Sequence, residues 1–184
     1  LAAGTGCTPT TSMGRVFDAV ASLLDVRHDV AYEGQAAMEL EALAATVPPD
    51  PAAAGPWRWE IDGGATPEDP LVLDPGPALG AGVAAVRAGA PPATAARAFH
   101  EGLADTVVAA VLSVATRHDV RAVGLTGGVF ANVLLTEAVA ARLGRHDVRV
   151  LTHRVVPPND GGLALGQAAV VAAGGAAPTT AAGG

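Results

Sequence analysis

The chain has 184 residues, a net charge of −7 and a composition that is 50% hydrophobic but only 3% aromatic. This length suffices for one domain with a core, or for two small ones, and the core must be built largely from Ala and Val. All eleven basic residues are Arg, which excludes a P-loop lysine and a Schiff-base lysine. An acidic chain without a basic stripe is also a poor binder of nucleic acid.

The cysteine content and the length of the apolar runs bear on where the protein is located in the cell. The single cysteine, Cys7, cannot form an internal disulfide or a multi-cysteine zinc site. The longest purely apolar run, Val107–Leu112, is far shorter than the roughly 18 residues that span a bilayer. The first residues carry no basic region followed by an apolar block, so we do not expect them to be a signal peptide. We therefore expect a cytoplasmic protein outside the membrane. Because the chain begins with Leu1, we also expect a fragment or a processed product.

Apolar residues at helical spacing predict two helices in the first third of the chain, followed by a strand pair. Ser12 precedes the first helix and is a candidate N-cap. The alternation in Trp57–Ile61 is typical of a half-buried strand. The predicted elements are helices Met13–Leu24 and Gln35–Ala45, a loop Val47–Pro56, and strands Trp57–Ile61 and Pro70–Leu73.

The second half of the chain predicts two more helices and then a strand, a glycine turn and a helix, twice over. This repeated order indicates a βαβα unit with parallel strands, and hence an α/β fold in which helices dominate. Residues 1–173 form one predicted lobe, and we expect residues 174–184, rich in Ala, Gly and Thr, to be disordered. The predicted elements are helices Pro75–Val86 and Pro92–Arg117, strand Arg121–Leu125, glycine entry and helix Gly127–Leu143, strand Asp147–Thr152, and glycine entry and helix Gly161–Ala173.

Ligands of parallel α/β sheets bind at the carboxyl ends of the strands, where this chain has two candidate loops. In the first, Gly127 and Gly128 let the backbone approach a ligand, with N–H groups at a helix N-terminus directed toward an anion. Asn132 is expected one turn into the helix, facing that ligand. The alternative is a plain strand–helix turn.

In the second loop, between His153 and Gly162, Asp160 directly precedes two glycines and a predicted helix. It resembles a carboxylate that serves a metal or a phosphate, but it could equally be the N-cap of helix Gly161–Ala173. The chain has only two asparagines, Asn132 and Asn159, and each lies in one of these loops. In so biased a composition, that placement suggests a function for both loops.

Other polar residues are weaker candidates. Asp18 lies on a mostly apolar helix, where its carboxylate either faces solvent or reaches into a site. Gly34 lies in a tight connection where backbone could approach a nucleotide base or ribose. We expect Glu39 and Glu41 to be solvated.

The histidines are scattered and form neither an HxxxH nor an HExxH motif, so no local pair can hold a metal. His100 on the long helix is expected to be a core or interface residue. The others that lie beside an Asp are expected at the surface, in turns: His28, His118 and His146.

Five segments in order resemble the C-terminal end of HypF, a family of carbamoyltransferases that mature nickel–iron hydrogenases. They are TSMGRVFDAVASLL, YEGQAAMELEALA, ARAFHEGLAD, GLTGGVFANVLL and VLTHRVVPPNDGGLALGQAAV, within about Thr10 to Ala173. The last segment is specific to this family. The GGVxxN pattern alone is shared with the tRNA threonylcarbamoyltransferase TsaD and with antibiotic O-carbamoyltransferases.

The resemblance implies an actin-like (ASKHA, ribonuclease H-like) fold of which this chain is mainly the second lobe. HypF-type enzymes use carbamoyl phosphate and ATP to make carbamoyl adenylate in an upstream domain. The carbamoyl group then passes to the C-terminal cysteine of the partner protein HypE, where it becomes a cyanide ligand. The alternatives are a lobe of a TsaD-like enzyme or O-carbamoyltransferase, and a non-catalytic remnant that is truncated.

The resemblance also implies roles for individual residues. It makes Asp160 a ligand of a divalent metal (iron, zinc or magnesium), whose other ligands, a histidine pair, come from the first lobe. It places Gly127, Gly128 and Asn132 in the adenylate pocket. Asp18 and Gly34 match positions on the ribose and adenine side. No catalytic residue is assigned, and without the first lobe and the upstream domains the chain is expected to be inactive.

Overall fold

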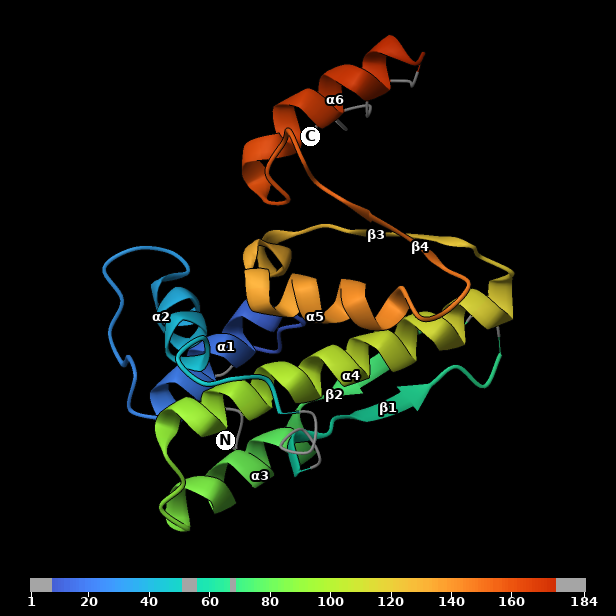
Figure 1. Cartoon of the computed structure of the whole chain (residues 1–184). Coiled ribbons are helices and arrows are strands. Elements are labelled where there is room, and N and C mark those ends of the chain that lie inside the picture. The colour runs from blue at the N-terminus through green and yellow to red at the C-terminus, as the bar shows by residue number, and fades with distance from the viewer. Residues whose placement is uncertain (1–7, 51–55, 67–68, 175–184) are drawn as a thin grey trace.

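The computed structural model describes residues 8–50, 56–66 and 69–174. Cys7 and most of the predicted disordered tail, residues 175–184, lie outside them. In this part of the chain, helices α1 to α5 form a body, and α6 stands apart from it (Figure 1). The elements are α1 (Met13–Leu23), α2 (Gln35–Ala44), β1 (Glu60–Gly63), β2 (Leu71–Asp74), α3 (Gly76–Arg87), α4 (Pro92–His118), β3 (Ala122–Leu125), α5 (Val133–Leu143), β4 (Arg149–Thr152) and α6 (Leu163–Ala172), with single 3₁₀ turns η2 (Gly128–Ala131) and η3 (Asp160–Gly162).

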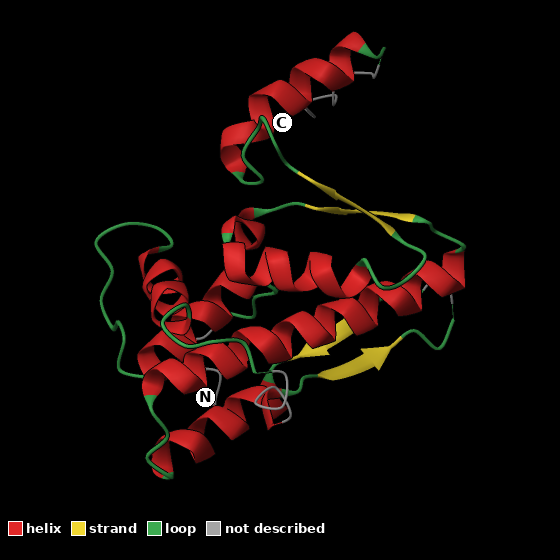
Figure 2. Ribbon diagram, in the orientation of Figure 1, coloured by secondary structure: helices red, strands yellow, loops and turns green. Residues whose placement is uncertain are grey.

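The body is organised around α4, which contacts α2, α3 and α5 (Figure 2). Pro92 begins this helix, as the fixed φ of proline allows at a first helical position, and Asp119 ends it in the left-handed conformation with φ 50°. An 18-residue stretch of this helix is long and apolar enough to cross a membrane. However, 56% of that stretch is buried inside the protein. Here α4 serves as the central core helix.

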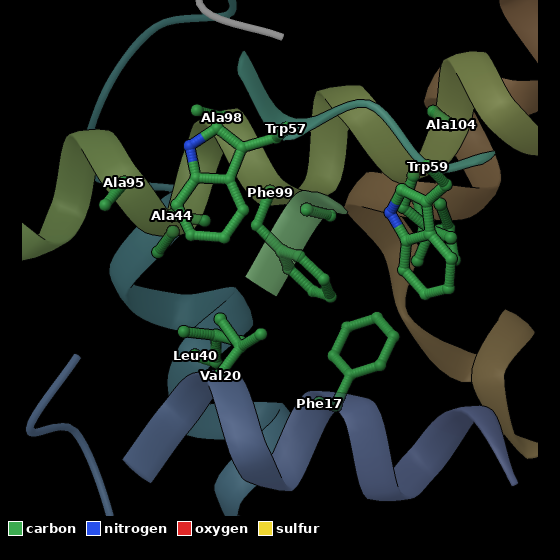
Figure 3. Close-up of a cluster of buried hydrophobic side chains, with 14 of the residues drawn as sticks. Phe17, Val20, Leu40, Ala44, Trp57, Trp59, Ala95, Ala98, Phe99 and Ala104 are labelled. Atoms are coloured by element: carbon green, nitrogen blue, oxygen red, sulfur yellow. The ribbon is translucent and has the colours of Figure 1, made fainter. Parts of the chain in front are cut away.

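Aromatic rings gather where α1 and the segment before β1 meet α4 (Figure 3). The Phe17 and Phe99 rings pack edge to face with centroids 5.0 Å apart, and Trp57 adds a third ring 5.9 Å from Phe99. A Cβ on Gly102 would lie 2.3 Å from the Trp57 carbonyl oxygen, so the close approach of this segment to α4 requires glycine. Two Phe and both Trp residues thus belong to the buried core, whereas Tyr32 is exposed.

The predicted strand Trp57–Ile61 is wrong in its position. The strand begins at Glu60 and runs to Gly63, pairing antiparallel with β2 so that Ile61 lies opposite Leu73. Trp57 and Trp59 precede it and are buried, because their indoles pack against α4 and not within a sheet. The alternation in this segment reflects burial against a helix.

The second half of the chain confirms the predicted strand–helix–strand order. β3 and β4 pair in parallel, with Val123 opposite Val150, and α5 connects them. The fold is therefore helix-rich α/β with a small parallel sheet, as expected. Helix ends agree with prediction within one or two residues, except that α5 begins only at Val133, after the separate 3₁₀ turn η2, so that Asn132 precedes the helix. Ser12 does precede α1, but its side chain makes no capping hydrogen bond.

The last helix, α6, differs from the rest. Every residue of α6 is exposed, and the helix projects away from the body beyond the end of β4 (Figure 1). All of its residues except Gly166 and Gln167 are Ala, Leu or Val. Its apolar surface is uncovered by any residue that the structure describes.

Candidate functional site

A cavity of about 250 Å³ lies at the carboxyl ends of β3 and β4. This is the sheet edge at which ligands of parallel α/β proteins bind, and where the two candidate loops were predicted. The residues that line it are Leu125, Phe130, Ala131, Thr136, Thr152, His153 and Pro158. They include residues of both loops, together with Thr136 of α5 and Thr152 of β4, so the structure brings the two loops together.

Hydrogen bonds tie the two loops to each other. The Gly127 N–H donates to the Pro158 carbonyl oxygen over 2.7 Å, and the Thr126 hydroxyl approaches the same oxygen at 3.4 Å. His153 Nε2 lies 3.0 Å from Thr126 Oγ1. Sequence reasoning did not select His153 as a site residue. Its only signal was its place at the end of β4 in the same loop as Asp160.

The glycine pair presents bare backbone to open space. Gly127 has φ +94°, a conformation that favours glycine, and a Cβ at Gly127 or Gly128 would meet no atom within 4 Å. Among the residues that the structure describes, the N–H groups of Gly128 and Val129 have no acceptor. This turn can therefore receive an acceptor such as a phosphate oxygen without displacing a protein group.

Asn132 is positioned differently from the expectation. It is buried and caps α5: its Oδ1 accepts from the Leu135 N–H over 2.9 Å. Its Nδ2 lies 3.0 Å from His100 Nε2, so the side chain points into the body and not toward the cavity side of the turn. Its short amide reaches the free N–H groups of its own helix, which explains the difference.

His100 completes this buried chain of hydrogen bonds, and its prediction as a core histidine is confirmed. Its Nδ1 lies 2.8 Å from the Ala96 carbonyl oxygen, which can only accept. Nδ1 therefore carries the proton and Nε2 accepts from Asn132. Burial lowers the pKa of His100, which favours this neutral form.

The expectation that Glu39 and Glu41 are solvated is wrong. Arg27 donates two hydrogen bonds to the Glu39 carboxylate, at 2.7 and 2.8 Å, and these lower its pKa. The Glu41 Oε1 accepts from the Val133 N–H at 2.6 Å and from the Leu134 N–H at 3.1 Å. Both carboxylates lie on α2 and find partners outside it.

Glu41 and Asn132 together change the interpretation of the first loop. Between them they occupy the N–H groups of Val133, Leu134 and Leu135. The N-terminus of α5 is thus closed to an external anion, contrary to the expectation that its N–H groups point toward one. The N–H groups that stay open belong to the glycine turn before it.

Asp160 begins η3 and is exposed, and Asn159 supplies the cap. The Asn159 Oδ1 accepts from the Gly161 N–H over 3.1 Å, so the alternative role of Asp160 as N-cap is wrong. The Asp160 carboxylate makes no hydrogen bond or ion pair with any residue in the described part of the chain, although its backbone carbonyl accepts from the Leu163 N–H. In that same part, no three His, Cys, Asp or Glu side chains are grouped to hold a metal ion.

Asp18 lies on α1, and Gly34 directly precedes α2. Asp18 pairs with Arg15 over 3.2 Å on the outer side of α1, and α1 contacts η2. Gly34 precedes α2 with φ +78°, and a Cβ there would meet nothing within 4 Å. His28, His118 and His146 are exposed, as predicted. The helix that carries Asp18, α1, adjoins the glycine turn, and the helix that follows Gly34, α2, is hydrogen-bonded to α5. No contact joins Asp18 to Gly34 in the described part of the chain.

Comparison with known proteins shows which family the chain resembles. Residues 1–167 match the family described as carbamoyltransferase, Kae1-like domain, second subdomain. The chain is 38% identical to carbamoyltransferase HypF2 of Cupriavidus necator over 86% of its length, and 38% identical to carbamoyltransferase HypF of Rhodobacter capsulatus over 94%. It spans about a fifth of each, 21% of their length.

Comparison with solved structures gives matches in the same family. A crystal structure of full-length HypF in a phosphate- and nucleotide-bound form superposes with a TM-score of 0.75 at 31% identity, over 87% of this chain and 20% of that one. HypF of T. kodakarensis gives a TM-score of 0.73 at 28% identity, over 91% of this chain and 20% of that one. The chain therefore belongs to the HypF family of carbamoyltransferases and matches its C-terminal part.

Proposed function

We propose that this chain is the second lobe of the carbamoyl-transfer domain of a HypF-type enzyme that acts in nickel–iron hydrogenase maturation. The enzyme would transfer a carbamoyl group from carbamoyl adenylate, made from carbamoyl phosphate and ATP, to the C-terminal cysteine of a HypE-type partner. One observation carries this proposal: a glycine turn is hydrogen-bonded to the loop that presents Asp160, and neither the turn's open N–H groups nor the Asp160 carboxylate has a partner among the described residues. The family match supports it.

The reaction explains why such groups are needed. When the acceptor sulfur attacks the carbamoyl carbon, the bond to the phosphate oxygen breaks and AMP leaves with its negative charge. N–H groups fixed in place stabilise developing charge without reorganising, and Gly128 and Val129 offer two of them. The Gly127–Pro158 hydrogen bond holds these groups beside the Asp160 loop.

A divalent metal fits Asp160 as one of its ligands. The carboxylate is exposed and unpaired within the described residues, and carboxylate oxygens suit magnesium, iron or zinc. A metal bound there would supply positive charge next to the leaving phosphate. Since the described residues offer no further grouped ligands, the rest of the set would come from the first lobe.

The nucleotide would lie across the two helices that adjoin the turn. Asp18 and the open backbone at Gly34 are proposed for the ribose and adenine side, and Asn132 for the adenylate pocket, where it acts by capping α5. The enzyme is proposed to be cytoplasmic, with no nucleic acid or membrane as partner. Transfer would require the first lobe and the upstream domains, so the 184 residues alone are proposed to be inactive.

The test uses the protein expressed from the complete reading frame that contains this chain. Asp160→Ala is expected to abolish carbamoyl transfer from labelled carbamoyl phosphate to a HypE-type acceptor, with an unchanged melting temperature, because the exposed side chain supports no contact of the fold. Asp29→Ala, another exposed aspartate, is the matched control and should transfer normally. Normal transfer by Asp160→Ala would refute the metal role.

A further inference from the structure

Glu41 joins two helices that are far apart in the sequence. It lies on α2, and its Oε1 accepts hydrogen bonds from the first two N–H groups of α5, 92 and 93 residues away. Capping carboxylates ordinarily come from the same helix that they cap. Here the carboxylate comes from a neighbour, so its loss would free α5 from α2 as well as uncap it.

The head of α5 in turn holds the glycine turn. The Thr136 hydroxyl on α5 donates to the Phe130 carbonyl oxygen of η2 over 2.9 Å, and the Asn132 N–H donates to the Val129 carbonyl oxygen over 3.1 Å. On its other side the turn is open, since neither Gly127 nor Gly128 has a neighbour near its Cβ direction. The turn is therefore held at two points: by α5 through Thr136, and by the second loop through the Gly127–Pro158 hydrogen bond.

We propose that Glu41 is a positioning residue that fixes the distance between the two halves of the nucleotide pocket. Gly34 directly precedes α2 and the glycine turn precedes α5. Among the described residues, the Glu41 carboxylate is the direct hydrogen-bonded link between these two helices. A charged acceptor at a helix N-terminus also gains from the helix dipole, which makes this link stronger than a neutral one. What the pocket holds rests on the proposed function; the link itself does not.

The first experiment measures amide hydrogen exchange by NMR in the 184-residue chain. Glu41→Ala should speed exchange of the Phe130 and Asn132 amides about tenfold, because the turn loses its support, while core amides of α4 such as Phe99 keep their rates. Glu41→Gln retains an acceptor oxygen and should restore most of the protection. Glu137→Gln removes an exposed carboxylate from α5 itself and should change nothing.

Two results would overturn the proposal at this stage. One is unchanged exchange at Phe130 and Asn132 in Glu41→Ala. The other is an equal acceleration at Phe99 and throughout α4, which would show that Glu41 contributes only to global stability. The Glu41→Gln variant keeps the test decisive if Glu41→Ala does not fold, because the proposal requires it to retain most of the protection at Phe130 and Asn132.

The second experiment uses the complete reading frame and measures inhibition of carbamoyl transfer by added AMP, the nucleotide that the transfer releases. Glu41→Ala should weaken this inhibition about tenfold, with Glu41→Gln close to wild type and Glu137→Gln unchanged. A fall in rate with unchanged AMP inhibition would indicate loss of folded enzyme and refute the positioning role. If the wild type transfers no carbamoyl group, the proposed function fails, and the exchange measurement still decides the role of Glu41.

Discussion

The helices α4 and α6 show opposite relations between composition and burial. α4 carries charged residues along its length, yet it is the central helix of the body, with twelve buried residues. α6 consists almost entirely of Ala, Leu and Val, yet none of its residues is buried. The difference teaches that burial depends on partners: α4 packs against α1, α2, α3 and α5, whereas no described residue covers α6.

Burial of charge in α4 depends on pairing. Glu101 is 3% exposed and lies between two arginines, with Arg97 Nε at 2.8 Å and Arg142 in hydrogen-bonding contact on the other side. A buried carboxylate is tolerated when cations and hydrogen bonds compensate for its lost hydration. An apolar helix such as α6 needs no such compensation, only a surface that covers it.

The largest expected effect follows directly from this comparison. Phe99→Ala in α4 should lower the free energy of unfolding by about 3–5 kcal/mol, because the ring is fully buried among aromatic neighbours. Leu165→Ala in α6 should change it by less than about 0.5 kcal/mol, since that side chain is 58% exposed. Urea unfolding of both variants measures the difference. Equal losses would show that α6 is packed in solution.

The body of the fold could be predicted from periodicity because its signals are local. The apolar spacing in α4 and the strand–glycine–helix order around β3 and β4 each lie within one continuous segment. The strand at Trp57 was misplaced because alternation reports burial and does not tell whether a sheet or a helix covers the side chain. The position of α6 away from the body also has no local signal.

The candidate site could be predicted only in part, for the same reason. The two loops and their meeting at the sheet edge follow from βαβα order, and Gly127 does adopt the conformation that favours glycine. The inward turn of Asn132 depends on His100, 32 residues away, and the role of Glu41 depends on a helix 92 residues away. Such long-range hydrogen bonds leave no pattern in one sequence.

A second prediction concerns how the stability of the body around α4 depends on pH. Burial lowers the pKa of His100 in the folded chain, so the unfolded chain binds a proton that the folded chain does not. The contribution of neutral His100 to the free energy of unfolding is complete above about pH 6.5, the ordinary pKa of a histidine in the unfolded chain. Below that pH the free energy of unfolding falls, by at most about 1.4 kcal/mol per pH unit. His100→Gln should flatten this part of the stability curve between pH 6.5 and 5 in urea unfolding.

His28→Gln is the control for that measurement, because His28 is exposed and bonds to Ser22 and Asp25 near the surface. Its curve should follow that of the wild type. If His100→Gln instead retained the full pH dependence, the hydrogen-bonded arrangement around His100 and Asn132 would not control the acid response of the body.

The smallest effect on stability is expected in α6, where the measurable change is in association. Leu165→Ser with Val171→Ser removes apolar surface that is 58% and 63% exposed, so the melting temperature should stay within about 1 °C of wild type. Because an uncovered apolar helix promotes self-association, the same variant should be more monomeric by sedimentation. A wild-type chain that is already a monodisperse monomer would show that α6 needs no cover, and that its composition has another cause.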